Sequence, residues 1–118
     1  MKKSWADKWV KALRSGKYKQ GRERLHKVDA SNHHKYCCLG VLCELAEVTK
    51  EKVGDGFQYN GMAAVLPLEV MKLTGMKDEA GDFSGEYFLT EFNDGAGGAP
   101  KKNFKEIADI IEKNWRKL

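Results

Sequence analysis

Residues 36–43 read YCCLGVLC and form the most apolar run in an otherwise polar chain. From Cys38 onward, apolar residues recur at spacings of three, four and seven, the pattern of one broad helical face. This pattern predicts a largely buried helix over residues 38–48. Because the chain has only 118 residues, we expect a single core built around this helix.

Length and composition indicate one globular domain covering residues 1–118. Hydrophobic residues make up 42% and charged residues 32% of the chain, which excludes a disordered protein. No apolar run approaches the roughly 20 residues that a membrane-spanning helix needs, and the first residues lack the apolar segment of a signal peptide. We therefore expect a cytoplasmic protein without a membrane partner. Three cysteines, two of them adjacent, suit free thiols in a reducing compartment.

Positive charge is concentrated in the first third of the chain. Residues 1–36 hold 11 Lys or Arg against 3 Asp or Glu, whereas residues 37–118 hold 10 against 14. The net charge of +4 therefore hides a basic segment followed by an acidic one. This asymmetry indicates an anionic partner, and a solvated lysine-rich surface is the plain alternative.

The two ends of the chain predict amphipathic helices. Ser4 and Asp7 form a capping-box pattern, and Gly16 supplies a left-handed residue after the first helix, which should end at Ser15. Asn103 and Glu106 form a second capping box before the last helix. The apolar stripe of the last helix comprises Phe104, Ile107, Ala108, Ile110, Ile111 and Trp115.

The middle of the chain predicts short strands. Residues 25–28 suggest one strand, and a turn is expected at residues 29–32. The Asn-Gly pair at residues 60–61 predicts a hairpin turn between residues 57–59 and residues 62–65.

The remaining segments complete the predicted fold. A short helix is expected between Pro67 and Gly75, and residues 76–85 should form an exposed loop. The buried face of this helix should comprise Val70, Met71 and Leu73. Residues 87–92 fit either a strand or one helical turn, and residues 93–100 should form a glycine-rich loop. The sum is an α+β domain of three or four helices packed with a small antiparallel sheet or hairpin.

Two constellations near the central helix resemble reactive sites. His33, His34, Cys37 and Cys38 offer four soft ligands, and only a distant His26 or another cysteine could complete the set. Ligands from one short segment rarely close a tetrahedron, so we expect no metal and no cofactor. Cys37 is the best-placed nucleophile, because a helix start lowers the pKa of a thiol and either adjacent histidine is a candidate base. No catalytic signature accompanies it, and buried structural thiols are the simpler interpretation.

The basic segment combines cations with an aromatic ring and an amide, a mixture that pairs with phosphates and stacks on bases. These residues are Arg14, Lys17, Tyr18, Gln20, Arg22 and Arg24. No helix-turn-helix, zinc-finger or RNA-binding signature accompanies them. The glycine-rich loop after Asn93 and Asp94 leads to the capped start of the last helix, which suits an anion. It lacks the lysine and hydroxyl residue of a P-loop, and a plain connector is the alternative.

Four blocks of the chain resemble a group of small proteins encoded by tailed phages and prophages. They are residues 9–20 (WVKALRSGKYKQ), 36–43 (YCCLGVLC), 89–94 (LTEFND) and 104–111 (FKEIADII). Similar proteins often have a second glycine soon after Gly21, where this chain has Glu23. The resemblance implies a phage context, in which small non-enzymatic proteins often counter host defences from within the bacterial cytoplasm.

Within that context, the best physical match is a sponge that binds a nucleotide immune signal without cleaving it. Such signals include cyclic oligonucleotides and ADP-ribose derivatives, which are compact, anionic and aromatic. We expect Arg14 or Arg24 on a phosphate, Tyr18 on the base and Asp94 on a ribose hydroxyl, provided that the basic segment and the glycine loop lie side by side. The expected ligand-binding residues are Arg14, Lys17, Tyr18, Gln20, Arg22, Arg24, Tyr36, Asn93 and Asp94. Sponges commonly oligomerise, so we expect a homo-oligomer that covers exposed tryptophan surface.

Two alternatives stay open at this stage. The first is a small hydrolase or transferase that acts on a nucleotide through Cys37 or Asp94. The second is a module that binds nucleic acid or an acidic host protein through the basic first third of the chain.

Overall fold

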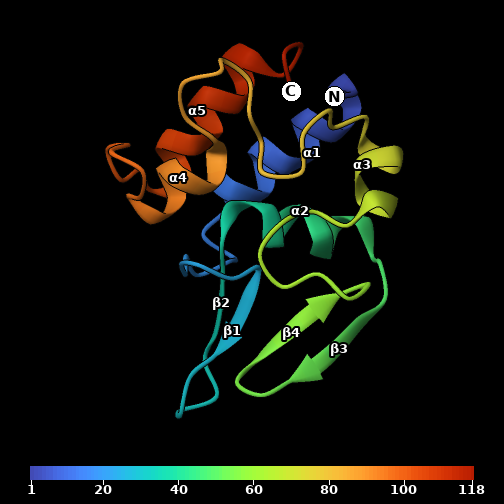
Figure 1. Cartoon of the computed structure of the whole chain (residues 1–118), viewed down its shortest axis with the longest axis vertical. Coiled ribbons are helices and arrows are strands. Elements are labelled where there is room, and N and C mark those ends of the chain that lie inside the picture. The colour runs from blue at the N-terminus through green and yellow to red at the C-terminus, as the bar shows by residue number, and fades with distance from the viewer.

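In the computed structural model, which describes all residues from Met1 to Leu118, the helices gather at one end of the molecule and the sheet lies at the other (Figure 1). The elements in chain order are α1 (Lys3–Arg14), β1 (His26–Val28), β2 (His34–Tyr36), α2 (Cys38–Ala46), β3 (Lys50–Val53), β4 (Gly56–Tyr59), α3 (Leu68–Thr74), α4 (Leu89–Asp94) and α5 (Phe104–Asn114). The four strands form one antiparallel sheet in the order β2-β1-β4-β3. The predicted single α+β domain is confirmed, with a fifth helix of one and a half turns, α4.

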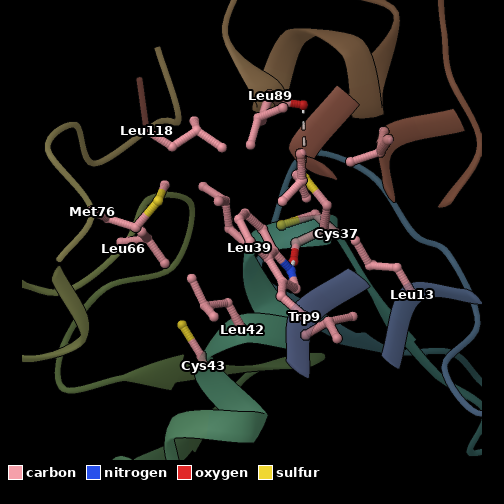
Figure 2. Packing of buried hydrophobic residues seen from close by; sticks show 14 of the residues in the cluster. Trp9, Leu13, Cys37, Leu39, Leu42, Cys43, Leu66, Met76, Leu89 and Leu118 are labelled. Atoms are coloured by element: carbon pink, nitrogen blue, oxygen red, sulfur yellow. Dashed lines mark hydrogen bonds between the residues drawn. The ribbon is translucent and has the colours of Figure 1, made fainter. Parts of the chain in front are cut away.

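Helix α2 lies between the helical end and the sheet, as the apolar stretch predicted (Figure 1). All residues from Cys38 to Cys43 are buried, so both sides of the helix need cover. Trp9 of α1 supplies part of it: its side chain is fully buried and its indole N–H donates to the Cys38 carbonyl at 2.9 Å (Figure 2). The helix ends at Ala46, two residues earlier than predicted, because Glu47 takes the left-handed conformation.

The glycine inside the apolar stretch has a packing reason. A Cβ atom at Gly40 would lie 1.8 Å from the carbonyl oxygen of Leu25. The same carbonyl accepts the Cys37 backbone N–H at 3.3 Å. The backbone just before β1 therefore runs directly against the first turn of α2, and this close approach sets how the sheet meets the helices.

The two terminal helices pack against each other, but only one of their predicted caps forms. Asn103 and Glu106 make the predicted capping box, with reciprocal bonds of 2.9 and 3.1 Å. The capping box at Ser4 is wrong: α1 begins at Lys3 and Lys2 holds the N-cap position. The Lys2 N–H donates to the Thr74 carbonyl at 2.8 Å, so a contact with the end of α3 fixes where α1 starts.

The sheet contains a hairpin that the sequence patterns missed. The predicted turn at residues 29–32 lies between β1 and β2, and the second of these strands was not predicted. Residues 60–61 both adopt positive φ. Past that second turn, however, only Tyr59 and Met62 pair, so the hairpin predicted there is wrong in its strands. The missed hairpin consists of β3 and β4, which pair over four residues each. All four β3 residues, Lys-Glu-Lys-Val, are exposed, so no alternation marked the strand.

The remaining segments show smaller departures. Helix α3 ends at Thr74, with Gly75 just past its end as predicted. It buries Val70, but Leu73 is 40% exposed and Thr74 takes the buried position instead. The segment that fitted a strand or a helical turn is α4, which also includes Asn93 and Asp94, so the glycine-rich loop starts at Gly95. The predicted exposed loop after α3 is wrong at Met76, which is buried. None of the five helices is long and apolar enough to cross a membrane.

Candidate anion-binding site

The nine predicted ligand residues lie in the segment between α1 and β1 or near it, but they do not line one pocket. Arg14, Tyr18 and Gln20 line a hollow of about 360 Å³ beside the start of α5. Gln20 also lines a second cleft, together with Arg22. Lys17 borders a further hollow with Tyr18, and the ring of Tyr36 meets that of Tyr18 edge-on at 5.3 Å.

The assumed proximity of the basic segment and the Asn93–Asp94 pair is correct. The Gln20 side-chain amide donates to Asn93 Oδ1 at 3.0 Å, and the Glu23 N–H donates to Asp94 Oδ1 at the same distance. Asn93 itself is fully buried, and its Oδ1 also accepts the Cys38 N–H while its Nδ2 donates to the Gly21 carbonyl. Asn93 therefore holds Gln20 and Gly21 in place from the interior of the molecule and cannot reach a ligand.

The two arginines expected to hold phosphate already have carboxylate partners. The Arg14 guanidinium donates to Glu112 at 3.0 Å and to Asp109 at 2.7 Å on α5, and these hydrogen bonds raise the pKa of Arg14. Arg24 is paired with Asp55 in the turn between β3 and β4. Both cations tie segments together, so neither offers uncompensated charge to a ligand.

A cleft of about 410 Å³ on the sheet side combines Arg22 of the basic segment with one lysine from β1 and one from β2. Its lining comprises Gln20, Gly21, Arg22, Lys27, Val28, Asp29, Lys35 and Asp55. Arg22 and Lys35 have no carboxylate within ion-pair distance, and the Lys27 ammonium is 3.7 Å from the exposed Glu23 carboxylate. Of the two acids in the lining, one is the partner of Arg24. The other, Asp29, accepts the Ser31 and His33 N–H groups, which lowers the pKa of Asp29.

Lys27 and Lys35 were missed by the sequence patterns, and their placement is the strongest feature of the cleft. They are direct partners across the antiparallel pair β1–β2. Like charges in directly opposite positions repel each other and destabilise a sheet. The predicted turn at residues 29–32 does not give this pair by itself, because a hairpin centred on it would place residue 27 opposite residue 34, and the actual register is shifted by one residue.

The floor of the cleft is backbone. The Gly21 N–H donates to the Tyr36 carbonyl at 2.7 Å, which attaches the basic segment alongside β2. A Cβ atom at Gly21 would stand 2.9 Å from Lys35 Cβ, so this glycine allows the segment to approach the strand closely. A neighbouring hollow of about 520 Å³ shares Gln20, Asp29 and Lys35 with the cleft and adds Lys19, Asn32, His33 and His34.

The cysteines are not reactive in this structure. All three are buried and unpaired. Burial raises the pKa of Cys37 to about 12 and outweighs the backbone N–H groups at the start of α2, so the predicted lowering is wrong. No group of three or more His, Cys, Asp or Glu side chains is arranged to hold a metal ion.

A hydrogen-bonded network of side chains connects β1, β2, β4 and α2. Buried His26 contacts the Tyr59 hydroxyl through Nδ1 at 2.9 Å and His34 Nδ1 through its own Nε2 at 2.7 Å. The Tyr59 hydroxyl donates to Glu44 Oε2 at 2.7 Å, and Lys50 donates to both oxygens of that carboxylate. Burial lowers the pKa of His26 to about 4. No sequence pattern had linked these residues.

Aromatic rings enclose the buried histidine of this chain. The ring centroids of Tyr36 and Phe57 lie 4.2 and 4.5 Å from that of His26. Burial raises the pKa of Tyr36 to about 12, so its phenol stays protonated at neutral pH. Tyr36 thus packs against His26 and does not line the cleft.

Fold and site together define a small α+β domain with a cationic cleft, whose lining includes two lysines that face each other across strands β1 and β2. Residues 1–115 match the model of a family described as a domain of unknown function, DUF8296, and the chain belongs to that family. No curated protein and no solved structure matches the chain.

Proposed function

We propose that the protein binds a compact anionic ligand of nucleotide type in the cleft of Arg22, Lys27 and Lys35, and holds it without cleaving it. The observation that carries this proposal is the cross-strand pair Lys27–Lys35. Two ammonium groups facing one cleft with a guanidinium make an arrangement that an anion stabilises, because phosphate oxygens satisfy all three cations at once. In the phage context, the ligand is a nucleotide-derived immune signal, and the protein sequesters it in the host cytoplasm.

The alternative of a nucleotide-acting enzyme has less support from the same residues. The Cys37 thiol is buried and stays protonated, so it cannot serve as a nucleophile at neutral pH. Asp94 is half-buried, and its Oδ1 accepts hydrogen bonds from the Glu23 backbone and from Asn93. Both groups act as parts of the framework that holds Gly21 and Gln20 in place.

The first test is calorimetric titration of the protein with ADP-ribose and with a cyclic dinucleotide, followed by mass spectrometry of the ligand released on heating. We expect saturable binding and release of an unchanged molecule. A chemically altered ligand would favour the enzyme. Binding of unrelated single-stranded sequences, with affinity falling steeply as salt is added, would favour the nucleic-acid module.

A charge reversal separates binding from stability. Lys35→Glu should weaken ligand binding by about tenfold or more, because it removes one cation and adds a carboxylate. The same change places opposite charges across the strand pair, so the free energy of unfolding should rise by about 0.5 kcal/mol. Lys113→Glu, on the exposed face of α5, is the matched control and should leave binding unchanged. Equal binding by both variants would sink the proposal.

Homo-oligomerisation stays a prediction, but the surface expected to carry it is different. Trp9 is buried and the other two tryptophans are half-buried, so only part of two tryptophan side chains is left for an interface to cover. The apolar side chains that α3 leaves in solvent are Leu68, which is 62% exposed, and Leu73. Light scattering on the wild type and on Leu68→Lys measures the oligomeric state and whether this helix affects it.

A further inference from the structure

The hydrogen-bonded network of Glu44, Tyr59, His26 and His34 has a defined donor-to-acceptor direction. Glu44 is paired with Lys50, and an ionised carboxylate can only accept hydrogen bonds. Tyr59 has one hydroxyl proton, and it is used on Glu44. The Tyr59 oxygen can therefore only accept from His26, which places the single imidazole proton of His26 on Nδ1.

The direction continues to the surface. Burial keeps His26 neutral, so its Nε2 carries no proton and must accept from its neighbour. The donor is Nδ1 of His34, 2.7 Å away. A neutral His34 then has its only proton on the inner edge of the ring, and its Nε2 is left as a bare acceptor on the outer edge. His34 is an exposed residue, and it lines the 520 Å³ hollow that adjoins the cationic cleft.

From this geometry we propose that His34 reads the base of the ligand, accepting a hydrogen bond from an exocyclic amino group through Nε2. This assignment rests on the proposed function for its ligand, while the proton position rests on the hydrogen-bond network and on the neutral state of buried His26. Lys35 lines both the cleft and the hollow, so a nucleoside attached to a phosphate on Lys35 can extend into the hollow that His34 also lines. The ligand class is therefore an aminated nucleotide such as an adenine nucleotide. Glu44, Tyr59 and His26 are positioning residues, because they act through His34.

The proton position has a direct readout. In nitrogen-15 NMR of the histidine side chains at a pH where they are neutral, we expect Nδ1 of His34 to be protonated and its Nε2 to be bare. His26 should show the same pattern. Tyr59→Phe removes the hydroxyl that fixes this order, so both rings should show mixed tautomers. Tyr18→Phe is the matched control, because the Tyr18 hydroxyl takes part in no hydrogen bond of the chain. A wild-type His34 protonated on Nε2 would overturn the proposal.

Ligand discrimination tests the acceptor itself. The probes are inorganic pyrophosphate, adenosine diphosphate, and purine riboside diphosphate, which differs from the second probe only by lacking the amino group. We expect the wild type to bind adenosine diphosphate about tenfold more tightly than the analogue, as one lost hydrogen bond implies. His34→Phe keeps an aromatic ring at an exposed position and should abolish the discrimination without changing pyrophosphate affinity.

The outcomes distinguish this proposal from the proposed function. If pyrophosphate binds and both nucleotides bind equally, the role of His34 is overturned and anion binding in the cleft survives. If none of the three probes binds, both proposals fail. If Tyr59→Phe keeps pyrophosphate affinity but loses the preference for the amino group, the positioning role of the hydrogen-bonded network is supported against a purely structural one.

Discussion

The helical end and the sheet end of this molecule are stabilised by different kinds of contact. Trp9, Leu39 and Ile107 are fully buried at the helical end, in a continuous apolar cluster. The sheet end is centred on buried His26, which is hydrogen-bonded through both ring nitrogens and stacked between aromatic rings. Apolar packing tolerates a change of side chain when volume is kept, whereas a hydrogen-bonded chain depends on each proton. The cationic cleft lies on the second kind of framework.

The largest expected effect is at the helical end. Trp9→Ala should lower the free energy of unfolding by about 3 to 5 kcal/mol, because it empties a fully buried site and removes a hydrogen bond to α2. Urea unfolding followed by circular dichroism measures the loss. Trp5→Ala, at a half-buried position on the same helix, is the control and should cost less than half as much. Equal losses would contradict the assigned role of Trp9.

Acid should weaken the sheet end. The pKa of folded His26 is about 4, whereas a histidine in an unfolded chain titrates near pH 6.5. Between these values only the unfolded state binds the proton. The free energy of unfolding should therefore fall as pH is lowered, by up to about 3 kcal/mol. The charged or titratable neighbours of His26 are Glu44, His34, Lys50, Tyr36 and Tyr59.

The measurement for this prediction is a series of urea titrations between about pH 7 and about pH 4. In a His26→Gln variant the fall over that range should be smaller than in the wild type. His33→Gln changes an exposed histidine whose charged partner is the Asp29 carboxylate at the surface, so it should alter the pH dependence less than His26→Gln does. A pH dependence that is the same in all three proteins would show that His26 is not its source.

The contact between the two ends gives the next effect. Asn93→Ala should lower the free energy of unfolding by about 2 to 3 kcal/mol, because the Cys38 N–H loses its partner in a buried environment. Ligand binding should weaken as well, since Gly21 and Gln20 lose the contact that positions them. Asn103→Ala, which removes the exposed cap of α5, should cost about 1 kcal/mol and leave ligand affinity intact.

The smallest effect concerns an exposed ion pair. Asp55→Asn should leave the free energy of unfolding nearly unchanged, because the Asp55 side chain is largely in solvent. It should, however, release Arg24 and remove a negative charge from the cleft lining, so pyrophosphate should bind more tightly. Calorimetry at two salt concentrations measures this. If pyrophosphate affinity is unchanged at both salt concentrations, the charge of the cleft does not govern binding.

The helices were predictable because their signals are local. The spacing of apolar residues around Leu39 and the Asn103–Glu106 capping box each lie within a few residues, and both were found where expected. Local chemistry failed at Ser4, because a backbone contact from Lys2 to Thr74 fixes the start of α1. It failed again at β3, where exposed residues carry no alternation and only pairing with β4 defines the strand.

The candidate site was predictable in its region but only partly in its residues. The charge asymmetry indicated the basic segment as the binding region, and the prediction that this segment lies close to Asn93 was correct. Which cations have partners depends on contacts 31 to 98 residues away in the chain, as with Arg24 and Arg14, and no local pattern contains that information. The Lys27–Lys35 pair required the register of a hairpin whose strands are only three residues long.

The bond from Asn93 to the Gly21 carbonyl joins positions 72 residues apart in the chain. During synthesis, the lysine-bearing hairpin leaves the ribosome long before α4 does, since domains are made from the N-terminal end. The backbone that floors the cleft cannot take its final place until α4 has emerged. A nascent chain that lacks α4 would therefore contain the cationic side chains but not the folded cleft. The proposed ligand binding would become possible only in a late step, when α4 packs against the segment that contains Gly21.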